Sequence, residues 1–278
     1  MKLNQFYVDN LIKEAINEDI NYIDVSADYL IPENQRNDSY FVAKADGVLC
    51  GLDIAMRVFT LLDDTFTYTV HKNDGDEVKA GDLIVEFNGK TACLLKGERT
   101  ALNIIQHMSG IATATNKAVK LCEGTNASVT DTRKTLPGLR ALQKYAVVCG
   151  GGKNHRYNLS DGAMLKDNHI DAGGGITNAV NILRSKLGHM VKIEVETRNF
   201  DEVKEAVAAG ADIIMLDNMN NDQMRECVEY IDGRAKTEAS GNITLDNIAD
   251  VAKTGVDIIS LGALTHSVKA FDISMKMR

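Results

Sequence analysis

Basic side chains are concentrated in one short stretch of an acidic chain. The 278 residues carry a net charge of −8, yet residues 131–169 hold seven Lys or Arg against three Asp, a local excess of 7 − 3 = 4. Arg offers a planar fork that binds a carboxylate through two hydrogen bonds, and Lys offers a point charge that suits phosphate. The cluster indicates a site for a small polyanion, although a solvated charged loop is the commoner meaning of a charge run. The basic residues are Arg133, Lys134, Arg140, Lys144, Lys153, Arg156 and Lys166.

Three segments present this charge. In residues 130–140 an expected strand runs into a Pro-Gly turn that displays Arg133 beside Lys134. Residues 150–156 read Gly-Gly-Gly-Lys-Asn-His-Arg, and backbone amides of such a loop can approach an anion closely. Residues 164–169 place a lysine at the end of an apolar strand. By itself that lysine could simply extend to solvent.

The elements that must position these residues follow a regular alternation after residue 127. Short apolar runs at 193–196, 213–217, 235–238 and 258–261 are expected strands, and amphipathic stretches separate them. This is typical of a parallel sheet built from βα units. An open sheet would give the same pattern, but polar residues at the end of strand after strand favour a β/α barrel. Those strand-end residues are Glu196, Asp217, Glu238 and Ser260.

The segment that carries these strands is too short for a complete barrel. Residues 110–265 cannot hold eight βα units at the roughly 250 residues that such barrels need, so we expect six or seven strands and incomplete closure. The preceding part begins with a short helix and has alternating strand-like runs at 39–44 and 66–71. A helix is expected over 97–121, with a break and a domain boundary near Ser109-Gly110.

Composition excludes several classes of protein. An apolar content of 44% and a charged content of 25% are ordinary for a folded chain. No run approaches the ~18 apolar residues of a membrane span, and the first residues do not form the apolar core of a signal peptide. The negative charge argues against nucleic-acid binding. From the lack of a membrane span and of a signal-peptide core we expect a cytoplasmic protein. Five scattered cysteines without a Cys-x-x-Cys pair suggest neither a disulfide framework nor a zinc site.

A succession of motifs covers nearly the whole chain and resembles the quinolinate phosphoribosyltransferase family. The most specific are Asp-Thr-Arg-Lys-Thr at 131–135, Gly-Gly-Gly-Lys-Asn-His-Arg at 150–156 and Leu-Lys-Asp-Asn-His at 165–169. Further matches are Gly97–Asn103, Ser109–Thr113, Glu194–Glu196, Leu216–Asn218, Glu238–Gly241 and Ser260–Ala263. The chain departs from the family pattern at Val148, a position that is often basic, and at Ile23–Ala27.

The resemblance implies an architecture and a reaction. It implies an N-terminal α/β sandwich domain over residues 1–109, an incomplete six- to seven-stranded β/α barrel over 110–265, and a C-terminal helix over 266–278 that returns to the N-terminal domain. The implied activity is a pentosyl transfer with Mg²⁺, in which quinolinate and phosphoribosyl pyrophosphate give nicotinate mononucleotide, pyrophosphate and carbon dioxide. The implied assembly is a homodimer or larger, with active sites shared between subunits.

The resemblance also assigns roles to individual residues. Arg133, His155, Arg156 and Lys166 would hold quinolinate, and Arg99 would enter from the neighbouring subunit. The catalytic set would be Lys134 and Lys166 at the pyrophosphate, with Glu196 and Asp217 at the ribose hydroxyls and hydrated magnesium. The 5′-phosphate would be held by Ser240, Gly241, Asn242, Gly262 and Ala263, assisted by His266, and Thr132 would also bind substrate.

Two alternatives stay open. One is a related phosphoribosyltransferase that acts on another aromatic acid; the arginine-rich set favours a diacid. The other is a non-catalytic metabolite sensor, which the presence of the four catalytic residues argues against.

Overall fold

The computed structural model describes residues 2–278, which form two compact units. Unit 1 consists of the residues up to Asn116, together with Leu136–Gly151 and Ser267–Arg278. Unit 2 consists of Lys117–Thr135 and Gly152–His266. The division differs from the expected one, because a central segment of the chain belongs to unit 1 and the first boundary follows residue 116 rather than 109.

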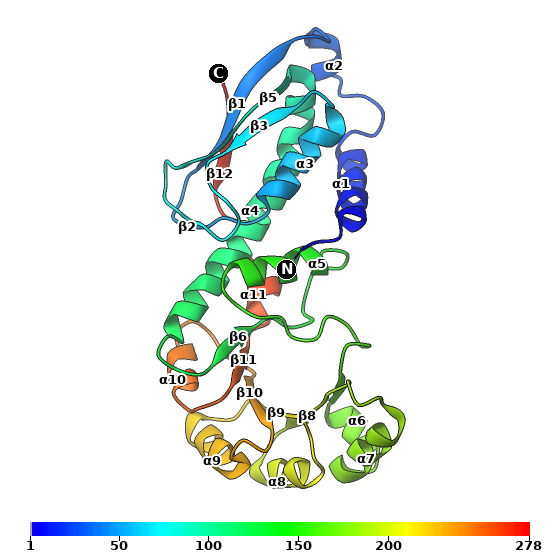
Figure 1. Ribbon diagram of the computed structural model, residues 1–278, viewed down its shortest axis with the longest axis vertical. Coiled ribbons are helices and arrows are strands. Elements are labelled where there is room, and N and C mark those ends of the chain that lie inside the picture. The colour runs from blue at the N-terminus through cyan, green and yellow to red at the C-terminus, as the bar shows by residue number, and fades with distance from the viewer. Residues whose placement is uncertain (1) are drawn as a thin grey trace. The chain divides into compact units, whose positions relative to one another are not determined.

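A four-stranded antiparallel sheet in the order β12-β1-β5-β3 forms the framework of unit 1 (Figure 1). A short two-stranded sheet pairs β2 with β4. The elements are α1 (Gln5–Asp19), α2 (Ala27–Leu30), β1 (Arg36–Ala43), β2 (Gly47–Val48), α3 (Leu52–Leu62), β3 (Thr67–Val70), β4 (Glu77–Val78), β5 (Leu83–Lys90), α4 (Thr91–Leu121), α5 (Arg140–Cys149) and β12 (Ile273–Met277). The part of α4 after Asn116 belongs to unit 2.

Aromatic side chains join α3 to the sheet. The ring of Phe59 on α3 stacks on Phe66 and on Phe87, with 5.3 Å between centroids in both pairs. Phe41 of β1 meets Phe87 of β5 edge to face at 5.2 Å. Such pairs contribute about 0.5–1.5 kcal/mol beyond the area that they bury. The alternation of buried and half-buried residues along β1 therefore points one face of the sheet at this cluster.

Helix α4 runs without interruption for 31 residues, so the expected break near Ser109-Gly110 is wrong. Gly110 lies inside the helix, and a Cβ there would come within 2.3 Å of the Lys269 carbonyl oxygen. The glycine lets the segment leading to β12 approach the helix closely. Gly110 is therefore needed for packing in the middle of the helix, although in the sequence it looks like a helix break.

The last residues form a strand rather than the expected helix. Strand β12 pairs antiparallel with β1, in a register that places Phe41 opposite Met275. Ile273 and Met275 are buried, and residues alternate along the strand with the period of two that a sheet requires. The segment is too short for this alternation to be distinguished from a helical pattern by sequence alone.

Unit 2 contains a six-stranded parallel sheet in the order β6-β11-β10-β9-β8-β7. Successive strands from β7 to β11 are neighbours, and β11 returns to β6, which is the order of a barrel wall. Its elements are β6 (Ser128–Thr130), β7 (Ala163–Leu165), α6 (Asp167–Ala172), α7 (Ile176–Lys186), β8 (Ile193–Thr197), α8 (Phe200–Ala208), β9 (Ile213–Asp217), α9 (Asn221–Ile231), β10 (Lys236–Ser240), α10 (Ile248–Ala252), β11 (Ile258–Ser260) and α11 (Ala263–His266).

The barrel is incomplete, as expected. Lys153 adds an isolated parallel bridge to Thr130 on the free side of β6, and no ladder among residues 2–278 joins this segment to β7. Helices α7 to α10 pack along the outside of the strands (Figure 1). All six strands are parallel, so their carboxyl ends lie at one edge of the wall, where the expected site residues are carried.

Replacing Gly110 with Ala tests the close approach inside α4. Alanine is the better helix former, yet its methyl group would collide with the Lys269 carbonyl. We expect a loss of about 1–3 kcal/mol in the free energy of unfolding, measured as a lower urea midpoint and melting temperature. Gly188→Ala, at an exposed glycine with nothing within 4 Å of the added carbon, is the control and should change neither. Equal stability of both variants would contradict the assignment.

Candidate active site

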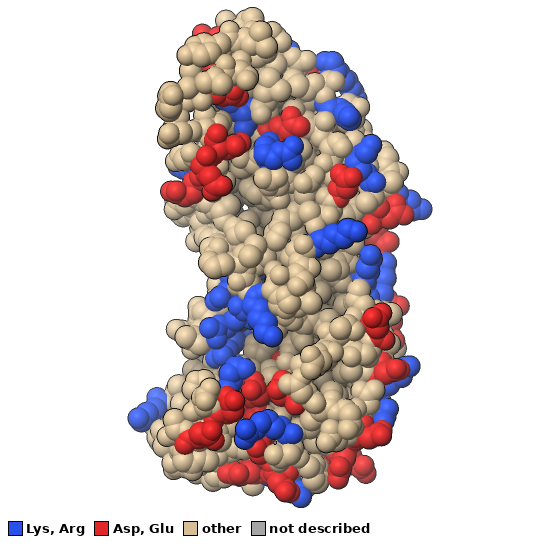
Figure 2. All heavy atoms as spheres, turned by 180° about the vertical axis from the view of Figure 1, so that it is seen from behind, with Lys and Arg blue, Asp and Glu red and all other residues tan. Residues whose placement is uncertain are grey.

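A cavity of about 750 Å³ opens at the carboxyl ends of the unit 2 strands. In the lower half of Figure 2, basic side chains lie beside a group of acidic ones on this unit. Fourteen of the fifteen residues predicted from sequence line the cavity, although they come from seven separate stretches of chain. They are Thr132, Arg133, Lys134, His155, Arg156, Lys166, Glu196, Asp217, Ser240, Gly241, Asn242, Gly262, Ala263 and His266.

Two guanidinium groups form the most strongly charged part of the cavity. Arg156 donates through one terminal nitrogen to the Gly162 carbonyl at 2.9 Å and through the other to the Met164 sulfur at 3.4 Å. Burial and the nearby charge of Arg133 lower the pKa of Arg156. The Nε atom of Arg133 is buried and has no hydrogen-bond partner among the described residues. An N–H donor left unsatisfied in this way is a site prepared for an anionic ligand.

His155, next to Arg156 in the chain, also lines the cavity and contacts two buried carboxylates. Its Nε2 atom is 3.2 Å from Glu194 and 3.4 Å from Glu238. Its backbone N–H donates to Asp131 at 2.9 Å, and Asp131 also accepts from the Asn154 side chain at 2.7 Å. The loop that carries His155 and the adjoining arginine is therefore fixed from both its backbone and its side chains.

The charge of His155 results from opposing influences. Burial disfavours the charged ring, but hydrogen bonds to Glu194 and Glu238 outweigh it and raise the pKa of His155 to about 10. Burial also raises the pKa of Glu194, and the hydrogen bond from His155 opposes that shift. The backbone N–H of Arg156 points at Nδ1 of His155 from 2.7 Å, a contact that favours the unprotonated nitrogen. The two carboxylates are the stronger influence, because they are buried and face one nitrogen.

Two acidic residues, Glu196 and Asp217, also line the cavity. Glu196 on β8 pairs with Lys166 at 2.5 Å, and Asp217 ends β9 and accepts from the Asn218 side chain at 2.7 Å. Asn218 has φ = 55°, a left-handed backbone that asparagine tolerates better than most residues. Its side-chain oxygen also accepts from Asn242 at 2.9 Å. Asn218 therefore joins the ends of β9 and β10 and orients the Asp217 carboxylate.

Two glycines, Gly241 and Gly262, let backbone line part of the cavity. Gly241 has φ = 89°, and a Cβ there would come within 2.3 Å of the Asn218 side chain. A Cβ at Gly262 would lie 2.8 Å from the Lys134 side chain. Thr265 further ties this part to the Lys134 carbonyl through a 2.8 Å hydrogen bond. Close packing of these loops leaves main-chain amides as the groups that can face a ligand.

Some predicted residues are not part of this cavity. Arg99, the fifteenth, is exposed on α4 in unit 1. The basic cluster of the sequence is also divided, since Arg140 and the fully buried Lys144 belong to α5 in unit 1. Lys153 donates to Ser128 at 2.8 Å and does not line the cavity. Only four of the seven clustered cations reach it.

Sequence reasoning missed several residues and misplaced one. Glu238 was expected at a strand end but lies within β10, whose last residue, Ser240, pairs with Asp217 of β9. Its carboxylate faces His155, as does that of Glu194, which was given no role. Asn218 also lines the cavity. Its position directly after Asp217 was visible, but its role depends on a positive φ that no sequence pattern announces.

A β/α barrel with cationic and acidic walls at its strand ends is characteristic of an enzyme that acts on polyanionic small molecules. Two family models match the chain: Quinolinate phosphoribosyl transferase, N-terminal domain, over residues 24–109, and Quinolinate phosphoribosyl transferase, C-terminal domain, over residues 111–276. The chain belongs to the quinolinate phosphoribosyltransferase family, as its motifs predict.

Individual relatives agree along their whole length. A probable nicotinate-nucleotide pyrophosphorylase (carboxylating) of Bacillus subtilis (strain 168) is 46% identical over 273 residues, covering 98% of this chain and 94% of the relative. The crystal structure of NadC from Streptococcus pyogenes is 42% identical with a TM-score of 0.96, covering 99% of this chain and 98% of that one. The nicotinate-nucleotide pyrophosphorylase structure from Francisella tularensis is 41% identical with a TM-score of 0.94, covering 100% and 98%.

Within residues 2–278, the helices lack the combination of length and apolar character that crossing a bilayer requires.

The charge of His155 predicts a distinctive titration. Because its folded pKa of about 10 exceeds the ordinary 6.5, the ionic contacts stabilise the fold fully below pH 6.5 and lose their effect as the pH rises through 10. NMR of ring-labelled protein should find His155 protonated from pH 6 to 8.5. In the double variant Glu194→Gln/Glu238→Gln, burial acts alone and the pKa should fall below 6.5. A wild-type ring that titrates near 6.5 would show that the Arg156 amide fixes the neutral form.

Proposed function

We propose that this chain is a decarboxylating quinolinate phosphoribosyltransferase of NAD biosynthesis. It converts quinolinate and phosphoribosyl pyrophosphate to nicotinate mononucleotide, pyrophosphate and carbon dioxide. The observation that carries the proposal is the pair Arg133 and Arg156, two guanidinium groups of one cavity whose charges oppose each other and of which one has a buried unsatisfied N–H. An aromatic acid with two neighbouring carboxylates supplies the charge and the acceptors that this pair lacks.

The remaining cavity residues divide between the two substrates. Quinolinate lies against Arg133, His155 and Arg156, with Lys166 reaching its edge. Lys134 and Lys166 face the pyrophosphate oxygens, and Ser240 to Asn242 with Gly262, Ala263 and His266 receive the 5′-phosphate. Thr132, whose hydroxyl accepts the Lys134 N–H at 3.0 Å, shapes the turn that presents the lysine. The proposal rests on these residues sharing one cavity of unit 2.

Positioning and electrostatics then perform the reaction. The departing pyrophosphate leaves positive character at the ribose, which the Glu196 and Asp217 carboxylates stabilise. The clamped ring nitrogen of quinolinate waits on the open face, so that the bond forms without a covalent enzyme intermediate. Once that nitrogen carries positive charge, the neighbouring carboxylate leaves as carbon dioxide more readily. The electron pair of the broken bond stays on the ring carbon, where it takes up a proton from solvent. The protein holds the adduct and excludes water.

The acidic wall fits a magnesium ion held mainly by substrate. One oxygen of Glu196 pairs with Lys166 and one oxygen of Asp217 accepts from Asn218, which leaves the other oxygen of each carboxylate available at the cavity. Among the described residues, neither belongs to a group of three protein ligands. Mg²⁺ is commonly bound by one or two carboxylates with phosphate oxygens and water, and there it would neutralise charge on the pyrophosphate. The five free cysteines of the described residues accord with the cytoplasmic location that we also propose.

The proposed assembly is a homodimer or larger in which Arg99 completes the site of a neighbouring subunit. Arg99 is exposed on α4, whereas every other proposed ligand lines the unit 2 cavity. The charge of Arg99 would add to the clamp for the second carboxylate of quinolinate.

The direct test supplies the purified protein with quinolinate, phosphoribosyl pyrophosphate and Mg²⁺. Nicotinate mononucleotide, followed by liquid chromatography, should accumulate together with equal amounts of carbon dioxide. Nicotinate in place of quinolinate should lower kcat/KM by at least about 100-fold, because one guanidinium group is left without its carboxylate. Equal turnover of the two acids, or turnover of another acid alone, would overturn the assignment.

In the same assay, substitutions of cavity residues can be compared with matched substitutions of surface residues. Arg133→Ala should lower kcat/KM for quinolinate by about 100-fold or more, whereas Arg225→Ala, at an arginine half exposed on α9, should not change it.

Glu196→Gln and Asp217→Asn should raise the Mg²⁺ concentration needed for half-maximal rate while quinolinate still binds. Asp222→Asn, at a 93% exposed carboxylate, controls for charge. Normal magnesium dependence in both cavity variants would contradict the metal assignment.

Subunit complementation tests Arg99. Arg99→Ala and Lys134→Ala proteins should each be inactive, but mixing, dissociation and reassembly should restore activity. Under random exchange half of the dimers are mixed, and each has one site of two intact, so recovery should reach about a quarter of the wild-type sites. No recovery despite exchange verified by mass spectrometry would place Arg99 in its own subunit's site or outside any site.

A further inference from the structure

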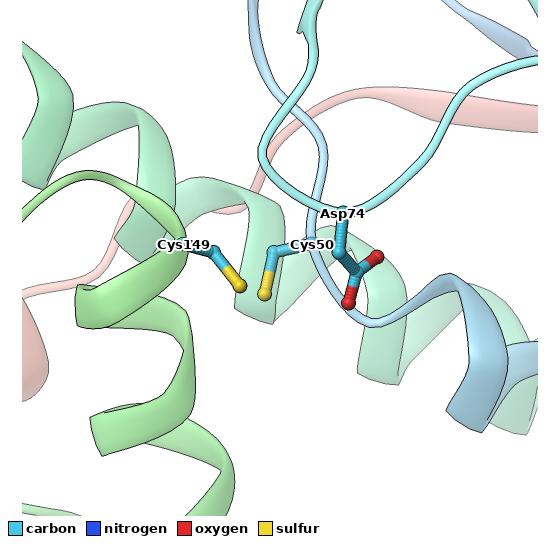
Figure 3. A group of neighbouring side chains, drawn as sticks. All are labelled: Cys50, Asp74 and Cys149. Atoms are coloured by element: carbon cyan, nitrogen blue, oxygen red, sulfur yellow. The ribbon is translucent and has the colours of Figure 1, made fainter. Parts of the chain in front are cut away.

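Two thiols from distant parts of the sequence face each other in unit 1. Cys50 lies two residues before the start of α3, and Cys149 is the last residue of α5. Their sulfur atoms and a carboxylate oxygen of Asp74 all lie within 4.8 Å of one another. Figure 3 shows the two sulfur atoms turned toward each other, with Asp74 beside Cys50. Neither cysteine lines the cavity of unit 2.

Asp74 holds the two cysteine-bearing segments together. Its carboxylate accepts the backbone N–H of Gly51 at 2.9 Å and that of Leu52 at 3.0 Å, directly after Cys50. It also accepts the hydroxyl of Tyr145 at 3.0 Å, one helical turn before Cys149. The juxtaposed thiols thus result from two backbone segments anchored to one carboxylate, rather than from the rotamer of a single side chain.

Helix α4 fixes the same segments from another side. The Ser109 hydroxyl accepts the Cys50 N–H at 2.9 Å and donates to the Cys50 carbonyl at 3.1 Å. A Cβ at Gly150, directly after Cys149, would come within 2.4 Å of the Ala112 carbonyl. Both cysteine backbones are therefore held against one helix.

A metal ion fits this cluster poorly. Donors from Gly51, Leu52 and Tyr145 occupy both oxygens of Asp74. A cation would have to displace them or rely on two sulfur ligands, whereas structural zinc sites use four protein ligands. The geometry instead suits a reaction between the thiols.

We propose that Cys50 and Cys149 form a reversible intramolecular disulfide, with Cys149 as the thiol that attacks the oxidant. The oxidant is a small disulfide of the glutathione type. The Cys149 thiolate attacks one sulfur of that disulfide, forms a mixed disulfide and releases one small thiolate. Cys50 then gives up its proton and attacks the Cys149 sulfur, which forms the protein disulfide and releases the second thiolate. The protein loses two protons and two electrons, and the small disulfide becomes two thiols.

The surroundings of the two sulfurs assign these roles. Cys149 is half-buried, whereas Cys50 is fully buried. A hydrogen bond from Cys50 lowers the pKa of Cys149, and burial raises the pKa of Cys50. Since the thiolate is the nucleophile, the first attack falls to Cys149. Cys50 needs no access to solvent, because the mixed disulfide forms beside it.

The inference does not depend on the proposed activity and is tested by peptide mapping. The folded protein is treated with oxidised glutathione, alkylated and digested with trypsin without reduction. The linked pair of residues 45–57 and 145–153 is expected as the main cross-linked product, lighter by two hydrogens than the separate peptides and released by dithiothreitol. Stable glutathione on Cys149 with no linked pair would overturn the proposal.

Single variants test the order of attack. Cys50→Ser should trap the glutathione adduct on Cys149, and Cys149→Ser should leave Cys50 unmodified. Cys93→Ser, at another half-buried thiol, is the control and should leave the linked pair unchanged. An adduct on Cys50 in the Cys149→Ser protein would overturn the assigned order. Stoichiometric binding of Zn²⁺ alone to the reduced protein, lost in both serine variants, would overturn the thiol assignment in favour of a metal site.

Discussion

The repulsion between Arg133 and Arg156 is the constraint on which the site depends. Holding two like charges in a half-buried cavity is costly, and nearby carboxylates must offset it. The negative charge of Glu194 raises the pKa of Arg156 and so counteracts part of its lowering by burial and by Arg133. Glu194 and Glu238 also both pair with His155. Glu194 and Glu238 thus offset part of the positive charge, while Arg133 and Arg156 still line the cavity. The cavity therefore keeps the positive charge that a dianionic acid requires, and the loop that carries His155 and Arg156 stays folded.

The fold class and the gathering of the expected residues around one cavity could both be predicted from sequence. In a parallel barrel the carboxyl ends of all strands meet at one edge, so residues such as Lys166, Glu196 and Asp217 are assembled by topology alone. The contact between Glu238 and His155, which also lines the cavity, could not be predicted. Glu238 looks like a strand-end residue, because an apolar run does not reveal where a strand stops. The register of β10 against β9 decides that its carboxylate lies inside the wall, opposite His155.

The wrong fold predictions have a common physical origin in contacts between distant residues. Gly110 looks like a helix breaker, yet it is needed because the Lys269 carbonyl packs on that turn. The residues of β12 become a strand because β1 offers them an edge. The paired thiols were invisible for the same reason, since the Asp74 carboxylate that brings them together lies in a turn far from both along the chain. Local sequence patterns indicate the conformation that a segment prefers by itself. The conformations of these segments depend on contacts with residues that are distant in the sequence.

Unit 1 is assembled from three separate pieces of the chain, and its strand β12 follows every residue of unit 2 in the sequence. During synthesis, therefore, unit 1 is completed only after all residues of unit 2 have been made. Until residues 273–277 leave the ribosome, β1 exposes the edge that they will cover, while the whole of the barrel sheet has already been made. A chain that stops a few residues early would keep every residue of the unit 2 cavity and still carry an open, aggregation-prone edge.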